Sequence, residues 1–170
     1  MTAFLAIDPG TYKTGVAYFE DSRLLGHWLV TVDPKAEIEV RIPALIADVE
    51  TIVRAHSNVR AVACERITAL EHRPAPELAT FVRRLRRWAT QKPHRFAWTD
   101  YHPSTVVASV RPRGTAGMGS KEVMKLGVKF LYGADFQGLW IDQNVIDAIA
   151  VGHCHISKTI EAERNDATVP

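Results

Sequence analysis

The stretch AIDPGTYKTGVAYF, residues 6–19, is the strongest indication of the fold in this chain. The apolar segment 3–7 leads into Asp-Pro-Gly at 8–10, which is typical of a strand that ends in a turn. Residues 14–20 are rich in strand-forming side chains and alternate in polarity, and residues 24–32 continue as a third strand. Three successive strands with short connections predict an antiparallel meander.

Helices and strands alternate in the rest of the sequence. The pattern of apolar residues predicts helices at 35–56, 76–91, 121–130 and 143–157, and a short helix after Pro103. Short apolar runs predict strands at 59–65 and 95–99. Pro43 predicts a kink in the first helix or a helix that starts at this residue, and Asp142 is the expected N-cap of the last helix. The order of elements predicts an α/β three-layer fold, in which helices flank a mixed five-stranded sheet whose first three strands are antiparallel.

Length and composition are those of one ordinary globular domain. The chain has 170 residues, of which 46% are hydrophobic and 24% charged. We expect a single domain over residues 1–158 and a loose tail over 159–170. Two cysteines cannot staple a chain of this size, so they indicate a reduced compartment, and we expect a cytoplasmic protein. We expect no secretory leader and no membrane span, because no apolar run approaches the ~20 residues that a span needs.

Charge is distributed unevenly, although the formal net charge is only +2. Residues 78–99 contain six basic side chains and no acid, and RRLRR at 83–87 is the densest part. This run has two interpretations, a solvated helix face or a surface that faces phosphates.

Acidic residues stand at two predicted strand ends and on the last predicted helix. Asp8 ends the first strand, Glu65 ends the fourth, and Asp147 lies in the last helix. Sites in open α/β sheets gather at the carboxyl ends of strands, so these side chains can converge there. Carboxylate oxygens suit Mg²⁺, and two such ions ~3.5–4 Å apart can support hydrolysis of a phosphodiester. The residue types therefore indicate a metal-dependent phosphodiesterase.

Four stretches, in order, resemble the RuvC Holliday-junction resolvases of the RNase H-like superfamily. They are AIDPGTYKTGVAYF, AVACERI at 61–67, MGSKEVM at 118–124 and NVIDAIAVGHCH at 144–155. The resemblance spans nearly the whole chain. It implies an RNase H-like fold and an endonuclease that resolves four-way DNA by paired symmetric nicks, leaving 5′-phosphate and 3′-hydroxyl ends. It also implies two Mg²⁺ per active site, for which Mn²⁺ can substitute.

The resemblance also assigns roles to individual residues. Asp8, Glu65 and Asp147 match the metal-binding acids of the family, and Lys121 matches a lysine suited to the scissile phosphate. Asn144 matches a position where family members have His or Asp, so here it would be a neutral oxygen ligand. Because Asn144 lies three residues before Asp147, both share one helix face.

Candidate DNA contacts surround the glycine-rich loop at 111–120. Arg111 and Arg113 flank its glycines, and Lys121 and Lys125 begin the following helix, so we expect these four residues to bind nucleic acid. Family members often have an aromatic residue shortly after the catalytic Glu, whereas this chain has Arg-Ile-Thr-Ala-Leu at 66–70.

The resolvase reading implies a homodimer, because a four-way junction has two-fold symmetry. The helix with Phe81, Leu85 and Trp88 could supply the interface, although the same side chains could belong to the core. His153-Cys154-His155 does not indicate a metal site, because alternate residues do not share a helix face and the sequence offers no companion ligands at metal-site spacing.

Other functions stay open. A YqgF-like nuclease acting on structured RNA would share the fold, and a catalytically weak junction-binding protein would suit Asn144. An actin-like phosphotransferase needs two such domains, for which 170 residues leave no room.

Overall fold

The sheet has the predicted mixed topology. The computed structural model describes residues 3–67, 76–133 and 141–167. Five strands lie in the order β3-β2-β1-β4-β5. They are β1 (Phe4–Asp8), β2 (Lys13–Glu20), β3 (Arg23–Thr31), β4 (Ala61–Glu65) and β5 (Ala97–Tyr101). The first three strands are antiparallel, and β4 and β5 run parallel to β1. The carboxyl ends of β1, β4 and β5 therefore meet at one edge of the sheet.

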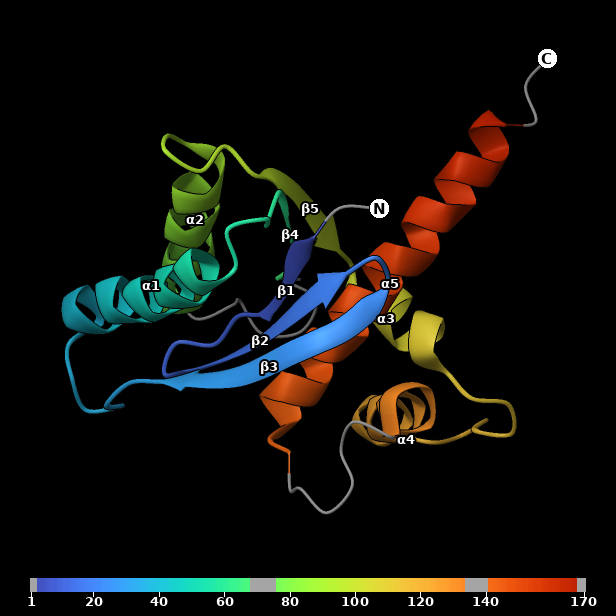
Figure 1. Cartoon of the computed structure of the whole chain (residues 1–170). Helices are drawn as coiled ribbons and strands as arrows, with labels where there is room; N and C mark the ends of the chain where they lie inside the picture. Colours follow the sequence, from blue (N-terminus) through green and yellow to red (C-terminus); the bar gives the residue numbers. More distant parts are fainter. Residues whose placement is uncertain (1–2, 68–75, 134–140, 168–170) are drawn as a thin grey trace.

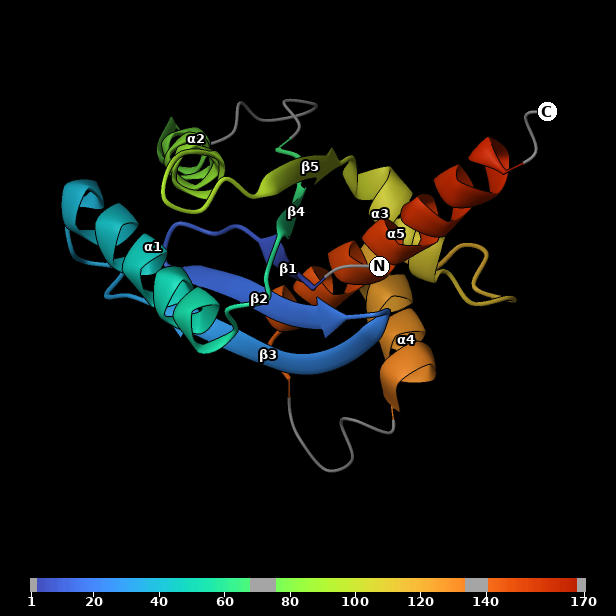
Figure 2. The ribbon, with the colours of Figure 1, turned by 45° about the horizontal axis from the view of Figure 1, so that its top comes forward.

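Helices cover both faces of the sheet, which confirms the three-layer α/β prediction (Figure 1). The helices are α1 (Ile38–Ala55), α2 (Pro76–Thr90), α3 (Pro103–Val110), α4 (Ser120–Tyr132) and α5 (Gln143–Asp166). Helices α1 and α2 lie on one side, while α5 crosses the other side with α3 and α4 packed against it (Figure 2). Alternation along β1 serves both layers, because Leu5 and Ile7 join the α1–α2 core whereas Phe4 and Ala6 join the α5 core.

The Thr14-Gly15 pair fixes the hairpin and the position of α5. Thr14 is fully buried, and its hydroxyl donates to the Gly10 carbonyl oxygen at 3.0 Å, which closes the turn between β1 and β2. A Cβ atom on Gly15 would overlap the Asn144 carbonyl at the start of α5. Only glycine lets the β2 backbone approach α5 this closely.

Several predicted boundaries differ from those of the structure. Helix α5 continues to Asp166, so the loose tail expected from residue 159 is helical through most of its length. Its residues 161–166 are exposed, and helix-forming residues together with the Lys158–Glu161 ion pair at 2.8 Å support these turns in place of core contacts. The fifth strand ends at Tyr101, two residues later than the predicted end at 99, while α1 begins five residues before Pro43 and includes it.

The apolar face of α2 belongs to the core. Phe81 and Leu85 are fully buried against the sheet and α1, and Trp88 packs beside them. These side chains are therefore not free to form the dimer interface that their helix could have supplied. No helix in the described part of the chain is long and apolar enough to cross a membrane.

Candidate active site

Asp8, Glu65 and Asp147 line one cleft, as the topology predicts. The cleft has a volume of about 720 Å³ and lies at the edge where β1 and β4 end. Lys121 of α4 and Arg111, the residue after α3, line the same cleft. Residues from distant parts of the sequence thus converge on one concavity that both acids and cations line.

Burial and mutual repulsion dominate the electrostatics of Asp8. Its pKa is raised well above its usual value, first by burial and then by the negative charges of Glu65 and Asp147. A hydrogen bond from the Asn144 side chain acts in the opposite direction and favours the ionised form. A positive charge between these carboxyl groups would remove the cause of the repulsion.

Glu65 and Asp147 are perturbed in the same direction. Burial and the nearby Asp147 raise the pKa of Glu65 to about 7. Burial raises the pKa of Asp147 to about 6, against the lowering effects of a hydrogen bond from Gln143 and the positive charge of Lys121. The Gln143 amide donates to Asp147 Oδ1 at 2.6 Å, which fixes the orientation of that carboxylate.

Asn144 contacts Asp8 but lies in a different concavity from the three acids. Its side chain lines a neighbouring pocket with Tyr12 and Lys13, and its Nδ2 atom donates to the Lys13 carbonyl oxygen at 3.4 Å. The amide nitrogen therefore serves as a donor to the turn and to Asp8. The N-cap prediction for Asp142 is confirmed, since its carboxylate accepts from the Asn144 backbone N–H at 3.0 Å.

The predicted DNA-binding residues do not all face the cleft. Lys121 and Arg111 do, and Arg111 also donates to the Thr115 carbonyl oxygen at 3.2 Å, which ties the glycine-rich loop to the cleft wall. Arg113 lines a separate pocket beside the end of α4. Lys125 is exposed one helical turn beyond Lys121 on the same face of α4.

His102 and Ser104 also line the cleft, and sequence reasoning missed them. His102 is the N-cap of α3, where its Nδ1 atom accepts from the Ser104 backbone N–H at 3.3 Å. A signal was available, because His102 directly follows the third parallel strand that ends at this edge. Placing the end of that strand at residue 99 concealed it. Arg66 and Ile67 line the cleft as well, whereas residues 68–70 lie outside the described residues.

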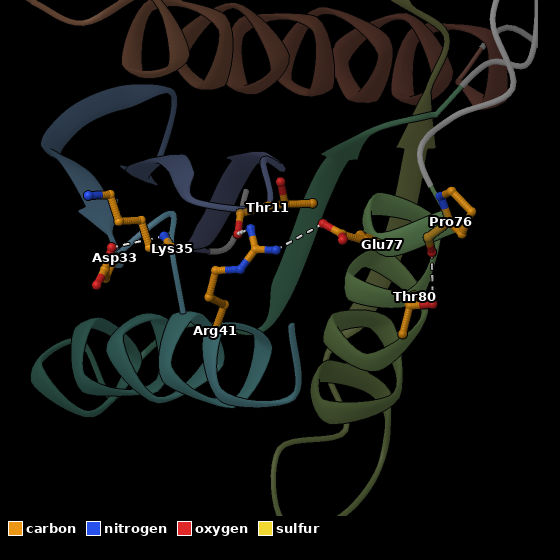
Figure 3. A network of polar contacts seen from close by, with 7 residues as sticks. All are labelled: Thr11, Asp33, Lys35, Arg41, Pro76, Glu77 and Thr80. Carbon is orange, nitrogen blue, oxygen red and sulfur yellow. Dashed lines mark hydrogen bonds and ion pairs between the residues drawn. The ribbon is translucent and has the colours of Figure 1, made fainter. Parts of the chain in front are cut away.

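A buried arginine braces the turn that follows Asp8. Arg41 of α1 is only 8% exposed and donates to the Thr11 carbonyl oxygen at 3.2 Å and to Glu77 Oε2 at 3.0 Å (Figure 3). Glu77 lies in the first turn of α2, so one guanidinium links α1, α2 and the turn. Its Nε atom is buried and has no hydrogen-bond partner among the residues that the structure describes.

The chemistry of the acidic residues fits divalent cations, but their spacing is not that of a formed metal site. Hard cations such as Mg²⁺ prefer oxygen donors, and here the charges of Glu65 and Asp147 raise the pKa of Asp8, while that of Asp147 raises the pKa of Glu65. Among the described residues, however, no three His, Cys, Asp or Glu side chains come close enough together to hold a metal ion. A bound cation would have to draw these side chains closer.

The His153-Cys154-His155 run packs α5 against its neighbours. Cys154 is buried in the core, while His153 and His155 form hydrogen bonds with the hydroxyls of Tyr132 at 3.0 Å and Tyr101 at 2.8 Å. These contacts hold α5 against α4 and β5.

Comparison with known proteins identifies the fold. No protein-family model and no curated protein matches the sequence. Solved structures do match, and Holliday-junction resolvases are among them. The RuvC protein of Thermus thermophilus in complex with a Holliday junction substrate has a TM-score of 0.75 at 19% identity, covering 95% of this chain and 96% of that one.

Two further structures agree. Another structure of Thermus thermophilus RuvC has a TM-score of 0.72 at 19% identity, covering 94% of this chain and 96% of that one. The yeast mitochondrial Holliday junction resolvase Ydc2 has a TM-score of 0.54 at 13% identity, covering 95% of this chain and 83% of that one. The predicted mixed α/β fold is confirmed, and it matches the fold of these resolvases.

Proposed function

We propose that this protein is a metal-dependent, structure-selective endonuclease that resolves four-way DNA junctions by paired, symmetric nicks. The observation that carries the proposal is the convergence of Asp8, Glu65 and Asp147 in one cleft whose wall includes Lys121 and Arg111. The carboxylates of the cleft suit metal ions, and its cations suit a phosphodiester. The likeness of the whole fold to junction resolvases supports this choice of substrate.

Asp8, Glu65 and Asp147 would hold the divalent ions, Mg²⁺ or Mn²⁺. When bound, two such ions would lower the pKa of the attacking water and stabilise the charge on the phosphate and on the leaving oxygen. Gln143 fixes the direction of the Asp147 carboxylate through its 2.6 Å hydrogen bond, and the Asn144 amide does the same for Asp8. Asn144 thus acts as a positioning residue toward Asp8, and its side-chain oxygen remains available as a neutral ligand for a metal ion.

The cations of the cleft would bind the substrate. Lys121 stands beside Asp147 and would neutralise charge on the scissile phosphate as the transition state forms. Arg111 would bind a neighbouring phosphate, because a guanidinium presents a planar pair of donors. Its bond to Thr115 would hold the glycine-rich loop at the DNA at the same time.

We also propose a homodimer, because symmetric cutting of a two-fold junction needs two related active sites. Burial of Phe81 and Leu85 means that the dimer would form through surfaces other than the apolar face of α2. A cytoplasmic location stays a prediction from the two cysteines, both of which are free and buried.

A cleavage assay tests the proposal. Labelled mobile four-way junction and linear duplex are incubated with the protein in Mg²⁺, Mn²⁺ or EDTA, and the cuts are mapped. We expect paired nicks in the junction alone, absent in EDTA and lost in Asp8→Asn. Asp48→Asn on the exposed side of α1 is the matched control and should cut normally.

One alternative has an observation in its favour. Because no three acidic side chains reach ligating distance among the described residues, a protein that binds junctions without cutting them is the second candidate. Tight junction binding in Mg²⁺ and Mn²⁺ with no nicks would select it. Cleavage of structured RNA in preference to the junction would instead select the YqgF-like activity.

A further inference from the structure

The solvent face of α2 is built from arginines. Arg83, Arg84, Arg86 and Arg87 are all exposed, whereas Phe81 and Leu85 on the opposite side are fully buried. At 100° per residue the four arginines span about 160° of the helix surface, centred away from the core. We call these four residues the arginine face.

Little negative charge lies close to the arginine face. Among the residues that the structure describes, Arg86 has an ion pair with Asp100 at 3.4 Å, and no ion pair forms at Arg83, Arg84 or Arg87. Residues 78–99 contain no acid. None of the four arginines therefore has a carboxylate three or four residues away on α2. A helix face that is simply solvated usually mixes both signs, which lowers its self-repulsion. This face retains four like charges.

The helix that carries the arginine face also contributes a residue to the cleft. Leu78, in the first turn of α2, lines the cleft with Asp8 and Glu65. At ~1.5 Å per residue, Arg83 lies ~8 Å and Arg87 ~14 Å further along the helix axis. Double-stranded DNA has one phosphate charge per ~1.7 Å of its axis, so a duplex leaving the cleft along α2 would pass several phosphates over this distance.

We propose that the arginine face of α2 binds the phosphate backbone of one duplex arm of the nucleic acid seated at the cleft. This inference rests on the proposed function and adds a second contact surface to it, separate from the residues of the cleft. Arginine suits this role better than lysine, because its planar guanidinium binds phosphate oxygens in pairs and is weakly hydrated. A second copy of the same face is a poor partner, since eight cations would then oppose one another.

The test measures salt dependence of binding without cleavage. In EDTA, the affinity for a four-way junction is measured from 50 to 200 mM salt for the wild type and for R83Q/R84Q/R86Q/R87Q. The control R23Q/K35Q/K158Q/R164Q removes the same charge from β3, the loop that follows it and the C-terminal part of α5. Each lost phosphate contact should reduce the slope of log affinity against log salt by ~0.9.

We expect the α2 variant to lose at least about 1.8 units of slope and to bind at least about tenfold more weakly at 100 mM salt. The control should keep the wild-type slope within about 0.9 unit. Light scattering and thermal unfolding should show the wild-type mass and melting temperature for both variants. A changed mass in the α2 variant would instead identify the face as a subunit interface and overturn the proposal.

Failure of this inference is distinguishable from failure of the proposed function. If the wild type cuts junctions but both variants keep its slope and affinity, the arginine face does not bind DNA and the function stands. If the wild type neither binds nor cuts junctions, the proposed function fails, and this inference fails with it.

Discussion

The Arg41 guanidinium holds the Thr11 carbonyl oxygen at 3.2 Å, although the two residues belong to different elements. Thr11 lies three residues after Asp8 in the turn between β1 and β2, and Arg41 lies in α1. The second contact of Arg41, with Glu77 at 3.0 Å, extends the link to α2 (Figure 3). Two helices of one layer are thus tied to the backbone that follows a candidate metal ligand.

Arg41→Met should therefore destabilise the fold and disturb the site together. The substitution keeps most of the apolar volume but leaves the Thr11 carbonyl without its donor, and hydrogen bonds from a charged group contribute about 1.5–3 kcal/mol. We expect a loss of about 2 kcal/mol in the free energy of unfolding, measured by urea denaturation. Junction cleavage should fall as well, because the turn loses its brace.

Glu77→Gln is the matched control for this link. The Glu77 side chain is 46% exposed, so its ion pair with Arg41 is screened by solvent and its loss should cost less than about 1 kcal/mol. The Thr11 contact remains intact in this variant. An equal loss of stability in the two variants would show that the ion pair, and not the bond to the turn, stabilises the region.

Gly15→Ala tests the close approach of β2 to α5. The new methyl group would overlap the Asn144 carbonyl, and neither backbone can yield without moving a strand or a helix. We expect destabilisation of at least about 3 kcal/mol. Gly119→Ala is the control, since a Cβ at Gly119 meets nothing within 4 Å, and its effect should stay within about 1 kcal/mol.

Amide substitutions of the acids should separate activity from stability. Asp8→Asn, Glu65→Gln and Asp147→Asn each remove one charge from a repulsive cluster, so each should raise the melting temperature of the metal-free protein at pH 7.5. Loss of a residue that only supports a metal ligand can reduce activity by up to ~100-fold. Loss of a ligand itself should therefore reduce cleavage by at least ~100-fold. Junction binding in EDTA should persist. Retention of cleavage in Asp8→Asn would refute the metal site.

The burial of two of these carboxyl groups, with repulsion as a smaller cause, predicts a pH dependence of stability. Glu65 and Asp147 have folded-state pKa values of about 7 and about 6, above their usual values of 4.5 and 3.8. Between these limits the folded state binds more protons than the unfolded state, so stability falls as pH rises from about 4 to about 7. In EDTA, we expect the melting temperature of Glu65→Gln/Asp147→Asn to exceed that of the wild type by more at pH 7.5 than at pH 5.

The comparison with this double variant is needed because other groups titrate in the same range. Burial lowers the pKa values of His153 and His155, which removes stability as pH falls. Both proteins share that effect, so their difference isolates the carboxyl groups. A difference that is independent of pH would show that Glu65 and Asp147 are not perturbed.

The sequence was sufficient for the parts of this structure that depend on local pattern and topology. Short apolar segments before Asp8 and Glu65 indicated strands, and parallel strands must end at one edge, so convergence of the acids was predictable. The Asp142 cap was predictable for the same reason, since it depends on residues adjacent in sequence.

Tertiary contacts without a local signal were not predictable. The hydrogen bond from Arg41 to Thr11 joins residues that are 30 positions apart, and no sequence pattern in either segment predicts it. The position of Asn144, in a neighbouring pocket with its amide donating to the Lys13 backbone, depends on how closely α5 approaches β2. The helical end of α5 was missed for the opposite reason, because an exposed polar segment resembles a loose tail until its ion pair is seen.

Asn144→Asp tests how far the neutral residue at this position sets metal binding. The new carboxylate would replace the amide donor to Asp8 with a fourth negative charge beside the cluster. Without metal, we expect a lower melting temperature at pH 7.5 than in the wild type, since repulsion increases and a hydrogen bond is lost. With Mg²⁺, the added charge should strengthen binding, so the rise in melting temperature on titration should begin at a lower Mg²⁺ concentration.

Asn144→Ala is the control, because it removes the hydrogen-bond donor to Asp8 without adding charge. It should lower the melting temperature of the metal-free protein without changing the response to Mg²⁺. If both variants respond to Mg²⁺ as the wild type does, residue 144 does not influence the metal ions, and its role is confined to holding the turn.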